Sequence, residues 1–176
     1  MRERWSDSKE ATQASQENNF VLRLVAYNEF VNSKIPSVIM ADMELISTHV
    51  CKESNVGFHG NLFGGTMLAW LDEAAAAYVC QMCNTPRMVT VKVAEVHFRK
   101  PVRPGQIIKI YGELKRIGTC SATVALEARR HSPYNGSQKT VLTTEMTFVR
   151  VDGDGEAVPV GEDVKKKRGM FAEDPP

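Results

Sequence analysis

A carboxylate stands in an apolar segment of this 176-residue chain. Residues 66–82 contain four consecutive alanines and no proline, and they end just before Pro86, a pattern that predicts a helix. An apolar helix face is expected to pack against another layer, where a carboxylate loses its hydration. Folding does not call for such a charge, so we interpret Asp72 as a functional group; the alternative is that it lies at the rim of the apolar face or pairs with a backbone donor. Helical spacing places it on a face whose other members are Leu68, Ala69, Ala75, Ala76 and Val79.

Two glycines, Gly64 and Gly65, open this helix. Glycine lets a ligand approach the main chain closely. The N–H groups of the first helical turn have no partner within the helix, and the helix dipole makes that end attractive to negative charge. A carbonyl group held there would have its developing oxyanion stabilised by donors fixed in advance. Together with Asp72, this helix start favours attack on a carbonyl compound.

The segments around the helix predict three regions. Residues 1–37 form an N-terminal extension, polar through residue 19 and then compatible with an amphipathic helix over 20–32. Residues 38–152 form the folded domain. Residues 153–176 form a C-terminal tail, whose basic run at 165–168 is typical of a solvated surface or, alternatively, of a contact with phosphate or a partner peptide.

Strands are predicted on both sides of the helix. One precedes it, and four follow it with short Gly- and Pro-containing turns between them. Consecutive strands with short connections pair antiparallel. Since only one long apolar helix is available to cover the sheet, we expect an α+β domain in which an antiparallel sheet curls around one central helix. The predicted strands are 38–50, 89–102, 106–117, 120–130 and 139–151, and a tight turn is predicted at 152–155.

The composition argues against a nucleic-acid-binding, membrane or secreted protein. The 22 basic and 21 acidic residues leave a net charge of +1, unlike the basic excess of nucleic-acid-binding proteins. Charges interrupt every apolar stretch before membrane-spanning length, and residues 1–19 lack the apolar core of a signal peptide. We therefore expect a cytoplasmic protein. Although Cys80 and Cys83 have redox-motif spacing, they end the helix, so we interpret all four cysteines as ordinary buried, reduced thiols.

Two segments of the chain resemble a known protein family. Residues 59–77, HGNLFGGTMLAWLDEAAAA, resemble the helix signature of hotdog-fold acyl-CoA thioesterases, in the acyl-CoA hydrolase branch. The following segment, VTVKVAEVHFRKPVRPG at 89–105, looks like the family's next strand and its exit turn. The resemblance runs from about residue 40 to 151.

The resemblance implies a hotdog fold in which two protomers join their sheets edge to edge, with active sites at the dimer interface and often three such dimers together. It implies hydrolysis of an acyl-CoA thioester with no metal or other cofactor, coenzyme A being part of the substrate. Asp72 matches the residue that acts as general base or nucleophile. Gly64 matches the backbone N–H that binds the oxyanion, and Thr90 matches a hydroxyl that orients water or the carboxylate.

One departure from the family pattern concerns a polar partner of the catalytic Asp. Relatives often have an Asn fifteen residues earlier, contributed across the interface, and this chain has Gly57 there. Asn55, His59 and Asn61 are the nearby candidates to replace it; Asn61 alternatively caps the helix. Substrate phosphates and adenine favour basic and small polar residues at a pocket mouth. The candidates for that role are Arg99, Lys100, Arg103, Gly118, Thr119 and Ser121, where solvated strand ends are the alternative. Gly65 is expected to contact substrate at the helix start.

Two other functions remain open from the sequence. A hotdog hydratase or dehydratase resembles a pattern with a catalytic His and an acidic partner at the helix start, where this chain has Phe63-Gly64-Gly65. An acyl-CoA-sensing domain would bind without turnover, and it would not need a carboxylate such as Asp72. The sequence does not fix the acyl chain, the choice between base and nucleophile, or the number of subunits.

Overall fold

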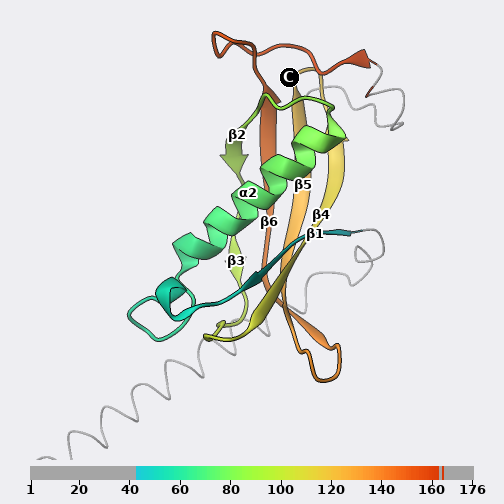
Figure 1. Ribbon diagram of the computed structural model, residues 1–176. Coiled ribbons are helices and arrows are strands. Elements are labelled where there is room, and N and C mark those ends of the chain that lie inside the picture. The colour runs from blue at the N-terminus through green and yellow to red at the C-terminus, as the bar shows by residue number, and fades with distance from the viewer. Residues whose placement is uncertain (1–42, 163, 165–176) are drawn as a thin grey trace, which may run out of the picture. The chain divides into compact units, whose positions relative to one another are not determined.

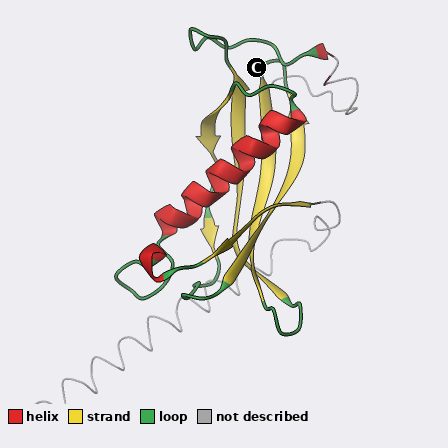
Figure 2. Cartoon of the chain, in the orientation of Figure 1, coloured by secondary structure: helices red, strands yellow, loops and turns green. Residues whose placement is uncertain are grey.

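The computed structural model describes residues 43–162 and 164, and the predictions for residues 1–42 and 165–176 lie outside that part. Figures 1 and 2 show one long helix lying across one face of an antiparallel sheet. The described strands follow the order β1-β4-β5-β6-β2, and the short β3 also pairs with β6. The elements are β1 (Glu44–Val50), the 3-10 turn η2 (Glu53–Asn55), α2 (Gly64–Met82), β2 (Met88–Val93), β3 (His97–Phe98), β4 (Ile107–Ile117), β5 (Ser121–His131) and β6 (Gln138–Arg150).

This arrangement confirms the predicted hotdog architecture, while the bounds of the helix and of the strand predicted at 89–102 were wrong. The helix begins at Gly64, so both glycines lie inside its first turn. The strand predicted at 89–102 is broken into β2 and β3. The strand predicted from residue 38 begins, within the described part, at Glu44. Strands β4, β5 and β6 match their predictions to within one residue at each end.

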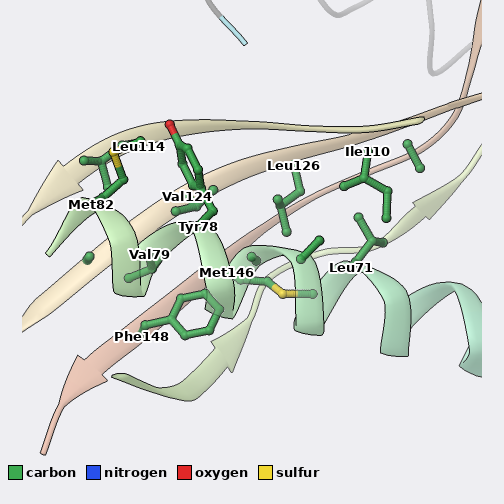
Figure 3. Packing of buried hydrophobic residues seen from close by; sticks show 14 of the residues in the cluster. Leu71, Tyr78, Val79, Met82, Ile110, Leu114, Val124, Leu126, Met146 and Phe148 are labelled. Atoms are coloured by element: carbon green, nitrogen blue, oxygen red, sulfur yellow. The ribbon is translucent and has the colours of Figure 1, made fainter. Parts of the chain in front are cut away.

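The core lies between α2 and the sheet. Leu71 and Val79 on the helix are fully buried, as are Val124, Met146 and Phe148 on the central strands. Figure 3 shows these side chains meeting between the two layers. Close packing of this kind fixes how the helix is rotated about its axis, because each buried side chain fits between its neighbours. The buried helix residues are Met67, Leu71, Ala74, Ala75, Tyr78, Val79 and Met82.

Residues after β6 continue along the sheet. Asp152 Oδ1 accepts the backbone N–H groups of Asp154 and Glu156, and these bonds form the predicted tight turn. The Val160 N–H then donates to the carbonyl of Thr119 at 2.8 Å, and Val160 is only 1 % exposed. The first part of the segment expected to be a tail is therefore packed against the β4–β5 turn.

The cysteines match their prediction in part. All four are free thiols. Cys51 and Cys83 are buried as expected, whereas Cys80 and Cys120 are half-buried. Among the described residues, no helix is long and apolar enough to cross a membrane.

Strand β1 meets the first half of α2 through two stacked rings. The His49 and Trp70 ring centroids lie 4.5 Å apart with planes at 8°. The hydroxyl of Ser47 lies 2.9 Å from His49 Nε2. Burial lowers the pKa of His49, and this effect outweighs the opposite influence of the Glu73 carboxylate.

Stability should therefore depend on pH through His49. Because folding lowers its pKa, the unfolded chain holds the proton more tightly, and this contribution is complete above the unfolded pKa of about 6.5. It is lost as pH falls from there through the folded pKa. We expect His49→Gln to reduce the loss of urea midpoint between about pH 7.5 and 5, whereas His59→Gln, at an exposed position, leaves it unchanged. Equal pH dependence in both variants would contradict the assignment.

Candidate active site

Asp72 on α2 and Thr90 on β2 form a direct contact. The Thr90 hydroxyl donates to Asp72 Oδ1 at 2.7 Å. A hydrogen bond to an ionised carboxylate is among the stronger kinds in proteins, and it holds the carboxylate in one orientation. It also leaves Oδ2 available to a water molecule. The two catalytic candidates that lay eighteen residues apart in sequence are thus adjacent in the fold.

The position of Asp72 on the helix differs from the sequence interpretation in one respect. The buried face is centred on Leu71, Ala75 and Tyr78, whereas Ala69 is exposed and Leu68 and Ala76 are half-buried. Asp72 is therefore at the margin of the apolar face, half-buried, and not in its middle. It faces the sheet edge formed by β2, where water has access.

The helix start is covered by two aromatic rings. A Cβ added at Gly65 would lie 2.5 Å from the Phe63 ring, and one added at Gly64 would lie 3.2 Å from the Phe98 ring. A side chain at Gly65 would require the exposed Phe63 ring to move, and the expectation that Gly65 contacts substrate stays a prediction. The first-turn N–H groups remain free of intrahelical partners, and Phe98 places this end of α2 beside β3.

Asp72 and the helix start are too far apart to act on one carbonyl within one chain. Gly64 and Asp72 are eight residues apart on α2, which corresponds to about 12 Å along the axis. A base and an oxyanion donor must each come within roughly 3 Å of the reacting group. Asp72 and the helix start are close in sequence, whereas the rise of the helix keeps them apart in space.

The loop before the helix ends in a tight turn at residues 57–61, here called the arm. Its tip is closed by hydrogen bonds from Gly57 N–H to the Asn61 carbonyl and from Gly60 N–H to the Gly57 carbonyl. Its base is held by the Leu62 N–H, which donates to the Val102 carbonyl. In Figure 1 the arm projects on the side of the sheet where β2 and β3 lie.

The polar candidates of this loop have different places. Asn55 accepts the Lys52 N–H with its side chain and the Phe63 N–H with its carbonyl, so it holds the loop together. Asn61 donates to the His59 carbonyl, and the residue that caps the helix is Phe63, so the capping prediction for Asn61 was wrong. His59 is exposed, and its ring contacts that of Phe58, which is 94 % exposed. The sequence interpretation did not single out Phe58, which stands together with His59 between Gly57 and Gly60.

The other substrate-binding candidates lie at opposite ends of the sheet. Arg99 and Lys100 follow β3 beside the helix start, and Arg99 also donates to the Thr143 hydroxyl at 3.2 Å. Gly118, Thr119 and Ser121 lie at the β4–β5 turn. Ser121 is in register with Val149, which pairs in turn with Val89, so this turn lies two strands from the start of β2. The structure does not bring the two groups together within one chain.

Strand β2 is an open edge of the sheet. Its side chains Val89, Val91 and Val93 are 43 %, 56 % and 45 % exposed. Unpaired main-chain groups together with exposed apolar side chains are typical of an edge that another strand covers. Because Thr90 lies on the same strand, whatever covers this edge also lies beside Asp72.

A separate cleft of about 630 Å³ lies on the other side of α2. It is bounded by the start of β1 and the second half of the helix, and Asp72 and Thr90 are not among its lining residues. Among the described residues, no group of three His, Cys, Asp or Glu side chains is placed to hold a metal ion.

Known proteins resemble this chain in sequence and fold. Residues 59–137 match the thioesterase superfamily. An uncharacterised acyl-CoA thioester hydrolase of Bacillus subtilis is 28% identical over 129 residues, covering 67% of this chain and 74% of that protein. A hexameric hotdog-fold thioesterase of Campylobacter jejuni superposes with a TM-score of 0.63 at 29% identity, covering 72% of this chain and 97% of the other.

A third relative carries ligands. The acyl-CoA hydrolase of Staphylococcus aureus, solved with butyryl coenzyme A, coenzyme A and coenzyme A disulfide, superposes with a TM-score of 0.61 at 26% identity. The match covers 69% of this chain and 76% of that protein. The chain therefore has the hotdog fold, and residues 59–137 within it are similar to the thioesterase superfamily.

Proposed function

We propose that this protein hydrolyses acyl-CoA thioesters, with Asp72 as the general base. The observation that carries the proposal is the half-buried carboxylate held by Thr90 at an open sheet edge. Support comes from the relatives, which are named acyl-CoA thioester hydrolases and acyl-CoA hydrolases.

In the proposed reaction, a water molecule on Asp72 Oδ2 attacks the thioester carbon and gives its proton to the carboxylate. The carbonyl oxygen becomes an oxyanion, which first-turn N–H groups of a helix stabilise. When the C–S bond breaks, the thiolate takes the proton from Asp72, and the products are the carboxylic acid and coenzyme A. We favour this role over direct attack by Asp72, because the half-exposed carboxylate is within reach of water.

Two copies are needed to complete this site. The distance of about 12 Å along α2 keeps Asp72 from sharing a carbonyl with its own Gly64. A second copy with its sheet joined along β2 would bring its own helix start to the first copy's Asp72. Twofold symmetry makes two identical composite sites.

The pairing of strand β6 supports one position for the proposed twofold axis. Thr90 lies at the level of Asp72 and pairs with Phe148 of β6. Phe98 lies at the level of the helix start and pairs with Leu142 of β6. An axis that exchanges these levels passes midway between them, at Glu145, whose carbonyl accepts the Ala94 N–H. We therefore propose that Ala94 faces the partner subunit's Ala94, and that the exposed valines of β2 are covered in the dimer. The hexameric Campylobacter jejuni relative supports three such dimers in the complete assembly.

The first prediction concerns the base. Asp72→Asn should lower kcat for acyl-CoA hydrolysis at least about a hundredfold, because the amide does not accept the proton of the attacking water. Thiol release from acetyl-, medium- and long-chain acyl-CoA measures it, and Glu73→Gln is the matched control, with the same charge change on an exposed neighbour. Wild-type turnover in a folded Asp72→Asn protein would remove Asp72 from the mechanism, and binding without turnover by the wild type would favour a sensing domain.

The second prediction concerns the hydroxyl. Thr90→Val keeps the side-chain shape and removes the hydrogen bond to Asp72. We expect kcat to fall about tenfold or more, because the free energy of a hydrogen bond to a charged group corresponds to a rate change of that size. Thr90→Ser restores the hydroxyl and should recover most of the rate. A Thr90→Val protein as active as the wild type would show that the bond has no part in the reaction.

The third prediction concerns the axis. Ala94 donates its N–H toward β6, so across the proposed axis two copies of it form a non-hydrogen-bonded pair with Cα atoms about 4.5 Å apart, within disulfide range. Ala94→Cys should give a covalent dimer on oxidation, detected by non-reducing electrophoresis. Val50→Cys, on the opposite edge strand β1, should not exceed the wild-type background. Equal cross-linking at both positions would rule out the axis at Ala94.

A further inference from the structure

A second pair of reactive side chains lies on strand β1, which is at the other end of the strand order from β2. The hydroxyl of Ser47 is 2.9 Å from His49 Nε2, and both side chains are half-buried. The His49 ring is stacked against Trp70 of α2, with centroids 4.5 Å apart, and this contact limits rotation of the imidazole. A serine beside a histidine whose ring is held in place is the arrangement that activates a hydroxyl as a nucleophile.

The imidazole of His49 is suited to act as the base. Burial lowers its pKa, so the ring is uncharged at neutral pH and one of its nitrogens can accept a proton. In the tautomer that carries its hydrogen on Nδ1, the accepting nitrogen is Nε2, which is the atom beside the Ser47 hydroxyl. The pair thus has a route for the proton that a serine must lose when it attacks a carbonyl carbon.

The free edge of β1 supplies a hydrogen-bond donor next to Ser47. On the β4 side, Cys51 donates its N–H to the Gln106 carbonyl. The register with β4 is regular over residues 47–50, and main-chain groups of an antiparallel strand alternate in direction, so the N–H of Thr48 points away from β4. Among the described strands, β1 has no second neighbour. The Thr48 N–H is therefore placed to donate to an oxyanion formed at Ser47.

The cleft on this side of α2 begins beside Ser47. Ile46, the preceding residue, lines the cleft together with Leu45 and Tyr78, and its volume is about 630 Å³. Among the described residues that line it, Glu44 is the only charged one. Apolar walls favour an apolar group, and a carboxylate disfavours an anion. The cleft therefore fits an uncharged ester and not the phosphates of coenzyme A.

We propose that Ser47 is the nucleophile of a second hydrolytic site, which acts on small uncharged carboxylic esters with His49 as its base. The Ser47 oxygen forms a bond to the ester carbon, and its proton passes to His49 Nε2. The bond between that carbon and the alcohol oxygen then breaks, and the alcohol leaves with the proton. Neither Asp72 nor Thr90 takes part, so this activity is independent of the proposed thioester hydrolysis.

A water molecule completes the reaction. It attacks the carbon of the acyl-serine and gives one proton to His49 Nε2. When the bond from this carbon to the Ser47 oxygen breaks, the proton returns to that oxygen and the carboxylic acid is released. One ester and one water thus give one acid and one alcohol, with no other reactant.

Covalent labelling tests the nucleophile in the unaltered protein. A fluorophosphonate, which reacts with activated serine hydroxyls, should modify Ser47 in the folded chain and not in the urea-unfolded chain, as read by mass spectrometry of peptides. His49→Gln should slow the modification at least about a hundredfold, because the base is lost. Ser54, an exposed serine in the η2 turn, is the internal control and should stay unmodified. No modification of Ser47, or equal modification of Ser54, would overturn the proposal.

Turnover is measured with p-nitrophenyl butyrate on the Asp72→Asn protein, in which the proposed thioester site is inactive. Ester hydrolysis should persist there, and adding Ser47→Ala should lower kcat at least about a hundredfold, as removal of a serine nucleophile does. Adding Ser54→Ala instead is the matched control and should leave kcat unchanged. Equal urea midpoints of the two double variants show that a loss of rate comes from the site and not from unfolding.

The outcomes separate this site from the proposed function. An Asp72→Asn protein that hydrolyses no ester, or one whose rate is unchanged by Ser47→Ala, would overturn the second site and leave thioester hydrolysis in place. A wild type that releases no thiol from acyl-CoA but hydrolyses the ester through Ser47 would refute the proposed function and support the second site.

Discussion

The packing of one helix against one sheet fixes the rest of this structure. The apolar face of α2, with Leu71 and Val79 fully buried, meets the central strands through Met146 and Phe148. Because this contact sets the rotation of the helix, it also sets where Asp72 points. Asp72 lies one step outside the buried face and reaches Thr90 on the edge strand. The packing of the core thus places the Asp72 carboxylate at the edge of the sheet.

The regular rise of the same helix limits what one chain can do. The features that favour carbonyl chemistry, the carboxylate and the free N–H groups, stand at two levels about 12 Å apart. A twofold axis between those levels would bring the Asp72 carboxylate of each copy to the first-turn N–H groups of the other copy. The open edge of β2, with its exposed valines, is the surface through which this exchange would occur.

Much of the site could be predicted from the sequence, and the reasons are local. Four alanines without a proline favour a helix, alternating strands with short turns favour an antiparallel sheet, and one available helix favours a single covering layer. Thr90 was expected near Asp72 only through the resemblance, and the structure confirms the contact. Asn61 as a cap was wrong, because its side chain bonds to His59 within the arm and Phe63 takes the capping position.

The sequence by itself determined the fold class, the helix and the identity of the carboxylate, because helix propensity, strand alternation and turn residues act over a few neighbouring positions. Only the tertiary structure decided that Asp72 is at the margin of the buried face and that the rings of Phe63 and Phe98 lie beside the helix start. It also decided that β2 is the open edge of the sheet. These properties depend on contacts between residues from distant parts of the chain and on the rise of the helix in space. Local sequence patterns report neither of them.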